Sequence, residues 1–263
     1  MRITVGTLNL WSGRRREDGR VDHEALAEAI DALDVDVLAV QEVDRFQERS
    51  GTLDQAAFVA ERFGAVWYRH VDTVVGTPAG HRWPVPSGGG PPLPEGAGAR
   101  SGYGIALLSR LPVLSSDVLA LPRSRHRYPA LIPGPPPRLV RVADEPRAAV
   151  RVTLAEPALT IACTHLSVLP WMSSRQLVQV ARWLGTGPAV LLGDLNLPRR
   201  AARRLTNWTP LVREATFPAA RPLVQLDNVL ATRLPPGARA VGRAVLLPVS
   251  DHRGVVAEVG YPD

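Results

Sequence analysis

The sequence predicts a four-layer αββα sandwich, in which two packed mixed β-sheets are flanked by helices. Three observations lead to this α/β (α+β) fold class. Helical and strand patterns alternate early in the chain, the middle runs from one strand pattern directly into the next, and 263 residues can bury a large core. A doubly wound parallel sheet needs a helix between nearly every pair of strands, so an α/β domain with an inserted β segment is the less favoured alternative.

The first predicted strand, Ile3 to Thr7, is followed by a helix over Asp22 to Leu33. Within this helix Leu26 and Ile30 recur at helical spacing with acidic residues between them, and Asp22 can cap its N-terminus. The same pattern predicts helices over residues 53–63 and 174–184.

Apolar runs predict the remaining strands, which lie at residues 35–40, 103–108, 113–119, 148–154, 159–163 and 189–192. Two segments interrupt this order. Residues 77–100 are rich in Pro and Gly, and residues 121–147 combine a Pro-rich run with six Arg. We expect long loops there, as walls of a substrate cleft or as surface excursions, within one domain that spans residues 1–263.

The chain is basic without containing any lysine. Its formal charge is +6, its pI is near 10.5, and all 31 Lys and Arg side chains are Arg. Such a surface favours nucleic acid, anionic lipid or phosphorylated small molecules as partners. A solvated charged face that maintains solubility explains the same excess, and the absence of lysine also fits a bias in genome composition.

Cysteine usage and the N-terminal sequence bear on the compartment. Cys163 is the single cysteine and lies in an apolar run, which indicates a small buried side chain and supports no disulfide within the chain. The first predicted strand follows Arg2 directly and leaves no room for a signal peptide, and no apolar run is long enough to span a bilayer. We therefore expect a cytoplasmic protein, and the sequence leaves its oligomeric state open.

Polar side chains close several of the apolar runs, and we expect them to gather at one edge of a sheet. They are Asn9, Glu42, His165, Asp194, Asn196, Asp227, Asp251 and His252. Each one alone has a simpler explanation as a turn, a helix cap or a structural polar group. Their joint occurrence after successive strands is hard to explain by independent turns, and it favours one shared site.

Hydrolysis of a phosphoester requires a cation, a base that positions water, and donors for the charge that develops on the phosphoryl oxygens. Glu42 offers an anionic oxygen suited to Mg²⁺, with Mn²⁺ as the alternative ion. Asn9 and Asp251 can complete that metal site directly or through water. The motifs therefore supply the first requirement.

The other requirements are met by the remaining motifs. Asp194 and Asn196 lie two residues apart and project to the same side of an extended chain, so one can orient water while the other donates an amide to phosphate. His165 and His252 are natural donors to phosphoryl oxygens. Asp227 is a candidate to hold one imidazole in the required tautomer.

At these residues the chain resembles the endonuclease/exonuclease/phosphatase superfamily, which has the deoxyribonuclease I-like fold. The resemblance runs from Thr7-Leu8-Asn9 to Ser250-Asp251-His252 and includes the stretch Gly102 to Arg110. It implies a four-layer fold and divalent-metal hydrolysis. Its implied site has Asn9, Glu42 and Asp251 at the metal, Asp194 on the attacking water, Asn196 on the phosphate, His165 and His252 around the scissile phosphate, and Asp227 orienting His252.

Two departures narrow the branch of the superfamily. The chain has His165 where repair nucleases that act at abasic sites have tyrosine, and Asp44 where they have lysine. It also lacks the paired cysteines of a secreted deoxyribonuclease I. The resemblance is therefore to the histidine-containing nucleases, lipid phosphodiesterases and phosphatases, and the substrate stays open.

Arginines follow the motifs in the segment 121–147 and directly after Asp194, at Arg199, Arg200, Arg203 and Arg204. Guanidinium groups bind phosphate well, which makes nucleic acid the leading substrate. We expect the substrate to contact Tyr103, Arg110, Arg199 and Arg200, and bases could stack on Trp11, Trp171 and Trp208. A solvated face and core packing are the simpler alternatives for these residues.

The sequence thus predicts a Mg²⁺-dependent phosphodiesterase or nuclease in which water activated by Asp194 attacks in line. An alternative within catalysis is a phosphatase or diesterase for a small phosphorylated molecule or a phospholipid head group. A non-catalytic phosphate-binding module is an alternative of another class. That module would be expected to have lost a central group, and none of them is missing from the sequence.

Overall fold

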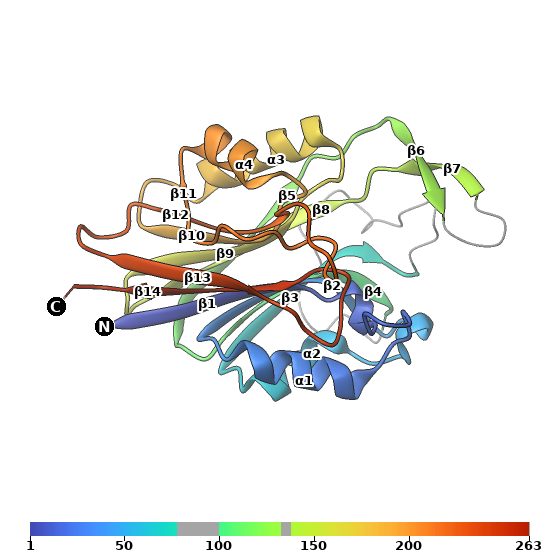
Figure 1. The fold of residues 1–263 in the computed structure, drawn as a ribbon, viewed down its shortest axis with the longest axis horizontal. Helices are drawn as coiled ribbons and strands as arrows, with labels where there is room; N and C mark the ends of the chain where they lie inside the picture. The colour runs from blue at the N-terminus through green and yellow to red at the C-terminus, as the bar shows by residue number, and fades with distance from the viewer. Residues whose placement is uncertain (78–99, 133–137, 263) are drawn as a thin grey trace.

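The structure is a computed structural model that describes residues 1–77, 100–132 and 138–262. Two six-stranded sheets pack face to face, in the orders β13-β14-β1-β2-β4-β3 and β11-β12-β10-β9-β8-β5 (Figure 1). Helices α1 and α2 cover the outer face of the first sheet, and α3 and α4 cover that of the second (Figure 1). The predicted four-layer sandwich is confirmed.

The first sheet contains β1 (Arg2–Asn9), β2 (Val37–Arg45), β3 (Trp67–Val75), β4 (Gly102–Ser109), β13 (Arg239–Val245) and β14 (Gly254–Gly260). The second contains β5 (Val113–Leu121), β8 (Arg147–Leu154), β9 (Leu159–His165), β10 (Ala189–Asp194), β11 (Thr209–Pro210) and β12 (Asp227–Thr232). The helices are α1 (His23–Leu33), α2 (Gln55–Phe63), α3 (Pro170–Trp183) and α4 (Arg199–Thr206), with 3-10 turns η1 (Trp11–Gly13) and η2 (Glu48–Ser50).

The helix boundaries follow local chemistry. Asp22 caps α1, because its carboxylate accepts the backbone N–H groups of Glu24 and Ala25, both at 3.0 Å. Helix α3 begins at Pro170, earlier than predicted, since proline is favoured in the first turn of a helix. Helix α4 was not predicted, because it is only eight residues long, has four arginines among them and buries only Ala202.

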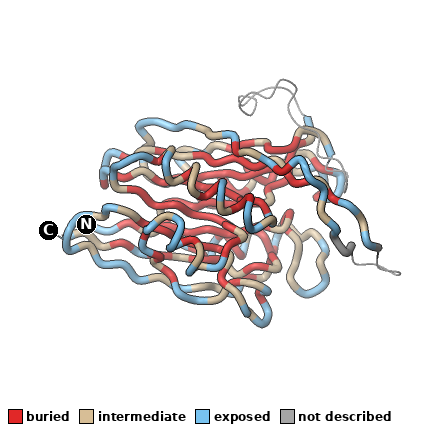
Figure 2. The backbone as a smooth tube through the Cα atoms, turned by 90° about the horizontal axis from the view of Figure 1, so that it is seen from above, coloured by how far each residue is buried: buried red, intermediate tan, exposed pale blue. Residues whose placement is uncertain are grey.

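Apolar side chains fill three layers of contact. One cluster lies between the sheets and includes Val5, Val150 and Ile161, and two more lie beneath the helices. Figure 2 shows the buried residues following the strands through the interior, with exposed residues on the helices and connections. Within the described residues, no helix is long and apolar enough to cross a membrane.

The two expected long loops have different outcomes. The first, 77–100, lies outside the described residues except at its ends. The second, 121–147, is not one loop: β6 (Arg127–Ile132) and β7 (Arg138–Ala143) pair with each other as an antiparallel hairpin. The Pro-rich run at 133–137 falls between these strands, so the pattern that indicated a loop belongs to their connection.

Strand direction brings the polar motifs to one edge of the sandwich. Strand β1 is parallel to β2, and β9 is parallel to β10. The carboxyl end of each pair therefore places Asn9 beside Gln41 in the first sheet and Asp194 beside His165 in the second. Strand β12 runs antiparallel to β10 and sets Asp227 opposite Asp194.

A close backbone contact at Gly193 fixes the end of β10. Its φ is +140°, and a Cβ atom there would lie 1.9 Å from the carbonyl oxygen of Thr164. No side chain fits this contact without moving β9 away from β10.

We expect Gly193→Ala to lower the free energy of unfolding by about 3 kcal/mol or more, because it combines a strained φ with a backbone clash. Urea denaturation measures the loss. The matched control is Gly187→Ala, where an added Cβ meets nothing within 4 Å and the φ is ordinary. Equal stability of the two variants would contradict the close packing of β9 and β10.

Candidate active site

Asn9 joins the two sheets at the edge where the polar motifs meet. Its side-chain Nδ2 donates to Glu42 Oε1 at 3.0 Å and to Asp194 Oδ2 at 3.3 Å, and its Oδ1 accepts the backbone N–H of Trp11 at 3.0 Å. Asn9 itself is 1% exposed. One buried amide therefore holds a carboxylate of each sheet at a fixed separation.

Glu42 reaches this position through an irregularity in β2. The register between β2 and β4 shifts between Gln41 and Val43, and Glu42 has a φ of +55°. A bulge of this kind turns one side chain out of the regular alternation of the strand. Burial raises the pKa of Glu42, while the Asn9 hydrogen bond and the His252 charge oppose that rise.

Asp194 stands at the centre of the cluster and is 2% exposed. Its Oδ1 accepts the backbone N–H of Asn196 at 2.9 Å, and its Oδ2 lies 3.5 Å from His165 Nε2 and 3.9 Å from His252 Nε2. Burial, with the nearby charge of Asp227, raises the pKa of Asp194 to about 6. A carboxylate with this pKa is ionised at neutral pH and is still a useful base.

Asp227 and His252 form a buried pair. His252 Nδ1 lies 2.8 Å from Asp227 Oδ2, and Asp227 is fully buried. Burial alone would lower the pKa of His252, but the charge and hydrogen bond of Asp227, followed by the charges of Asp194 and Asp251, raise it to about 10. The imidazole is therefore held as a cation with Nε2 toward Asp194.

His165 has the opposite character. It closes β9 and is 5% exposed. Burial holds its pKa well below the ordinary value, and the positive charges of Arg147 and His252 lower it further. One histidine of the site is thus neutral and the other charged, although both face the same aspartate.

The donor chemistry of the site fits a hard divalent cation. Burial raises the pKa of Asp251, the His252 charge opposes that rise, and the negative charge of Glu42 adds to it. Glu42 and Asp251 are oxygen donors of the type that Mg²⁺ and Mn²⁺ bind, and the hydrogen bond from Asn9 holds Glu42 in place. A cation bound beside Glu42 and Asp251 would reduce the electrostatic repulsion between the two carboxylates.

A second candidate group consists of Asp194, Asp227 and His252, whose ligand atoms lie within 4.8 Å of one another. The His252 ring already shares a 2.8 Å hydrogen bond with Asp227, and a metal between them would have to break it. Asp227 Oδ1 is buried without a hydrogen-bond partner among the described residues. The hydrogen-bonded dyad accounts for the group more simply than a metal does.

Two further predicted site residues border the cluster. Asn196 has a φ of +48°, and its Nδ2 donates to the carbonyl oxygen of Leu166 at 2.9 Å, which leaves the second N–H of the amide for another acceptor. Tyr103 is 6% exposed, and burial with the charges of Glu145 and Glu42 raises its pKa well above the ordinary value. Its ring faces the Arg49 guanidinium at 5.3 Å.

The structure places Arg110 away from the polar cluster. Arg110 binds the carbonyl oxygen of Phe63 and pairs with Asp34, and its backbone N–H donates to Asp36 at the start of β2. Glu42 lies at the other end of that strand, about 20 Å away at the usual rise per residue. The side chain closes the far end of the sheet.

The arginines after Asp194 lie on a helix that the sequence analysis did not predict. Arg199 and Arg200 open α4 on the outer face of the second sheet (Figure 1). Neither has a hydrogen bond or ion pair to a site residue in the described part of the chain. Of the tryptophans proposed for stacking, Trp208 is buried in the core, whereas Trp171 is 54% exposed.

Sequence reasoning missed Glu145 and Arg147, because both fall in the segment 121–147 that was expected to be a loop. Arg147 opens β8, is 6% exposed and pairs with Glu145 at 3.0 Å, while its Nε is buried without a partner among the described residues. Burial raises the pKa of Glu145 to about 7, with Arg147 opposing. The start of the apolar run at Ala148 was the signal that could have placed Arg147 at a strand end.

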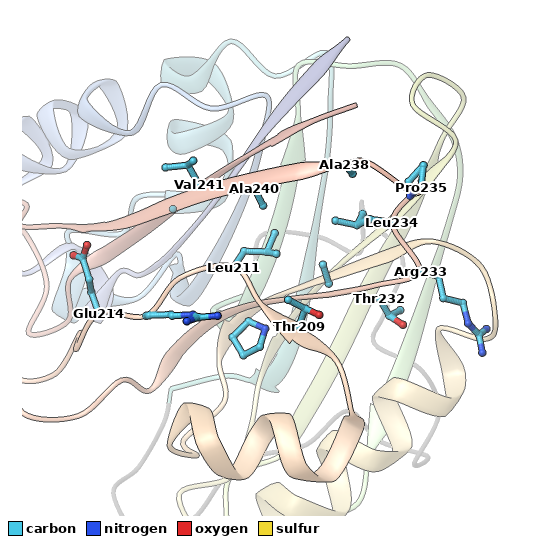
Figure 3. Close-up of a pocket in the computed structure, with 14 residues that line it drawn as sticks. Thr209, Leu211, Glu214, Thr232, Arg233, Leu234, Pro235, Ala238, Ala240 and Val241 are labelled. Atoms are coloured by element: carbon cyan, nitrogen blue, oxygen red, sulfur yellow. The ribbon is translucent and has the colours of Figure 1, made fainter. Parts of the chain in front are cut away.

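A separate groove lies elsewhere and carries different chemistry. It lies between β13, an edge strand of the first sheet, and the β11–β12 side of the second sheet (Figure 3). Its lining includes Thr232 and Arg233 at the end of β12, whereas Asp227 begins that strand in the polar cluster. The groove lacks a group of carboxylates and histidines, so we place the candidate active site at the polar cluster.

Comparison with known proteins identifies the family and agrees with the fold. A model of the endonuclease/exonuclease/phosphatase family matches residues 6–252. A comparison with curated protein sequences gave no significant match.

Similar solved structures include an endonuclease/exonuclease/phosphatase from Beutenbergia cavernae (24% identity, 98% of this chain and 71% of that chain, TM-score 0.66). Another is the endonuclease/exonuclease/phosphatase from Bacteroides vulgatus (16%, 100% and 100%, 0.62). A third is D. rerio TDP2 in complex with a single-strand DNA product (12%, 99% and 99%, 0.62). At these identities the likeness concerns the fold.

We expect Mg²⁺ or Mn²⁺ to raise the thermal stability of the wild type, by about 2.7 kcal/mol when the ion is at 100 times its dissociation constant. Glu42→Gln should lose most of this gain. In EDTA the same variant should be no less stable than the wild type, since it removes a buried charge and keeps an acceptor for Asn9. Differential scanning fluorimetry with and without the ion measures both effects.

The control for that measurement is Glu258→Gln, an exposed carboxylate on β14. It should respond to the ion as the wild type does. An equal gain in Glu42→Gln would remove Glu42 from the metal site.

Proposed function

The chain belongs to the endonuclease/exonuclease/phosphatase family, and we propose that it is a divalent-metal-dependent phosphodiesterase in which water activated by Asp194 attacks phosphorus in line. Members of this family are phosphoester hydrolases. The observation that carries the proposal is the geometry around the buried Asp194 carboxylate, whose Oδ2 lies 3.5 Å from His165 Nε2 and 3.9 Å from His252 Nε2. The pKa directions of the two histidines support it, because burial lowers that of His165 while Asp227 raises that of His252. Titratable groups whose pKa values are driven apart are typical of acid and base roles in catalysis.

Asp194 is the proposed base. It is held by the backbone N–H of Asn196 and by the Asn9 amide, so its position is fixed before a substrate arrives. A water molecule next to it would pass a proton to the carboxylate as its oxygen forms the bond to phosphorus. A pKa of about 6 suits this transfer at neutral pH.

His252 is the proposed acid. Asp227 keeps its ring oriented and charged, so Nε2 carries a proton toward the reacting centre. As the bond from phosphorus to the leaving oxygen breaks, that proton neutralises the alkoxide. His165, which stays neutral, can donate one N–H to a phosphoryl oxygen without adding charge.

The remaining polar residues have supporting roles in this proposal. Asn9, Glu42 and Asp251 would hold the cation. When bound, Mg²⁺ or Mn²⁺ would act as a Lewis acid that neutralises phosphoryl charge. The second N–H of Asn196 and the Nε of Arg147, neither of which has a partner among the described residues, are further donors available to phosphate oxygens.

Nucleic acid is the proposed substrate class, and two observations support it. The chain carries a net charge of +6, and a structure similar to this fold, TDP2 from D. rerio, holds a single-strand DNA product. We further propose that the chain acts as one domain over residues 1–263 and that it works in the cytoplasm.

The first test is hydrolysis of bis(p-nitrophenyl) phosphate with Mg²⁺ or Mn²⁺ and with EDTA. Wild type should turn over the diester only with the metal, and Asp194→Asn should lose about 100-fold or more in kcat. Asp117→Asn, which alters an exposed carboxylate of β5, is the control and should keep full activity. DNA and RNA panels follow once the diester is cleaved.

Other results would redirect the proposal. Turnover of p-nitrophenyl phosphate in place of the diester would identify a phosphatase for small molecules. If neither ester is cleaved while the ion still raises the thermal stability, the hydrolase proposal fails and a phosphate-binding module becomes the better account.

Asp227 and His252 should behave as one unit in kinetics. We expect Asp227→Asn and His252→Asn each to lower kcat for the diester by about 100-fold, and the double variant to lose little more than either single variant. Steady-state measurement of kcat for the wild type and the three variants completes a double-mutant cycle. Losses that multiply in the double variant would show that Asp227 does not act through His252.

A further inference from the structure

The β6–β7 hairpin is rooted beside the candidate active site. Asp144, which is 1% exposed, accepts the backbone N–H of Ser124 at 2.7 Å and the hydroxyl of Ser167 at 2.6 Å. Ser124 precedes β6, Asp144 follows β7, and Ser167 lies two residues after His165. One buried carboxylate therefore ties both roots of the hairpin to the loop that leaves the site.

A second contact supports the same root. Gln176 of α3 donates to the carbonyl oxygen of Pro122 at 2.7 Å and accepts the backbone N–H of Ser167 at 2.7 Å. The base of the hairpin, the loop after His165 and α3 thus form one hydrogen-bonded unit. A ligand on the hairpin would be held in a defined position relative to His165.

The exposed charges of the hairpin and its base are all basic. Arg123, Arg125, Arg127 and Arg141 are exposed, and none of them has an ion pair or side-chain hydrogen bond to a described residue. The acids of this segment are both buried and already engaged: Asp144 with the serines, and Glu145 with Arg147. Among the described residues, this positive charge has no local counterpart.

Two of these arginines share one face. Strand pairing sets Arg127 opposite Ala143 and Pro129 opposite Arg141, so Arg127 and Arg141 are diagonal neighbours about 7–8 Å apart. The other face carries Tyr128, half-buried, and Val142, which is 8% exposed. The hairpin therefore presents its charged face to solvent, where like charges repel each other unless an anion binds.

We propose that this face of the hairpin binds the phosphate backbone of a single-stranded nucleic acid and leads it to the active site. The proposal rests on the proposed function and names a second surface for its substrate. Planar guanidinium groups match phosphate oxygens, and a strand with regular charges can contact several of them at once.

Trp171 favours nucleic acid over other polyanions. It is 54% exposed in the first turn of α3, directly after the loop that Asp144 holds. Exposed aromatic rings beside a basic surface are platforms on which bases stack. A membrane is less suited, because Leu139 is the exposed large apolar residue of the hairpin among those described, and one such side chain gives little area to insert.

The test measures fluorescence anisotropy of a labelled single-stranded oligonucleotide in EDTA, so that binding is separated from cleavage. We expect the double variant Arg127→Gln/Arg141→Gln to bind about tenfold more weakly at low salt. The slope of log K against log salt should fall in magnitude by about 1.4, the value for two phosphate contacts on a single strand. The control is Arg239→Gln/Arg243→Gln on the exposed edge strand β13, which should bind as the wild type does.

Trp171→Ala gives an independent readout. It should weaken binding at least about fivefold while leaving the salt slope unchanged, because stacking releases no counterions. Tyr68→Ala, at the distant start of β3 and 39% exposed, is the aromatic control.

Hydrolysis of bis(p-nitrophenyl) phosphate separates this inference from the proposed function. The hairpin variant should hydrolyse that small diester as the wild type does. If wild type binds the oligonucleotide through the hairpin but cleaves no diester, the surface stands and the proposed function fails. The inference would be overturned if Arg127→Gln/Arg141→Gln bound the oligonucleotide as well as the control variant does. It would also be overturned if Arg127→Gln/Arg141→Gln lost binding to phosphatidylserine vesicles while its oligonucleotide binding stayed intact.

Discussion

Glu42, Asp194 and Asp251 bring three carboxylates together at one edge of the sandwich, where Asp194 is buried and the other two are partly buried, and the surrounding structure is organised around their repulsion. Burial raises the pKa of each of the three. Asn9 donates to two of them across the gap between the sheets, and the His252 cation lies beside them. Clustered carboxylates destabilise the folded state. The same clustering attracts a cation and raises the pKa of a carboxylate into the range that suits a base.

The backbone near the site bears a matching strain. Glu42, Asn196 and Ser250 have positive φ values, and Gly193 touches the neighbouring strand. Such conformations are unfavourable for residues with side chains and persist only where the surrounding fold imposes them. Here the rigid strands below impose them, since Thr7 and Gln41 bond each other directly beneath the cluster and Gln41 reaches Cys163 of the opposite sheet.

The sequence allowed the sandwich and most of the polar cluster to be predicted, because strand ends can be read from where apolar runs stop. Asn9, Glu42, His165, Asp194, Asp227 and His252 do meet in space. Arg110 lies at the opposite end of the sheet, because its own strand is antiparallel to β2 and the family-like stretch runs away from the site. Helix α4 and the β6–β7 hairpin escaped prediction. Helix α4 is short and has four arginines among its eight residues, and the hairpin strands flank a Pro-rich run that indicates a loop.

The bond between Asn9 and Asp194 joins residues 185 positions apart in the chain. Such a contact can form only after both sheets have closed on each other, and contacts of this separation make folding slow. The arrangement of Asn9, Glu42 and Asp194 therefore depends on the packing of both sheets against each other. A chain in which only one sheet has formed cannot hold these three side chains together.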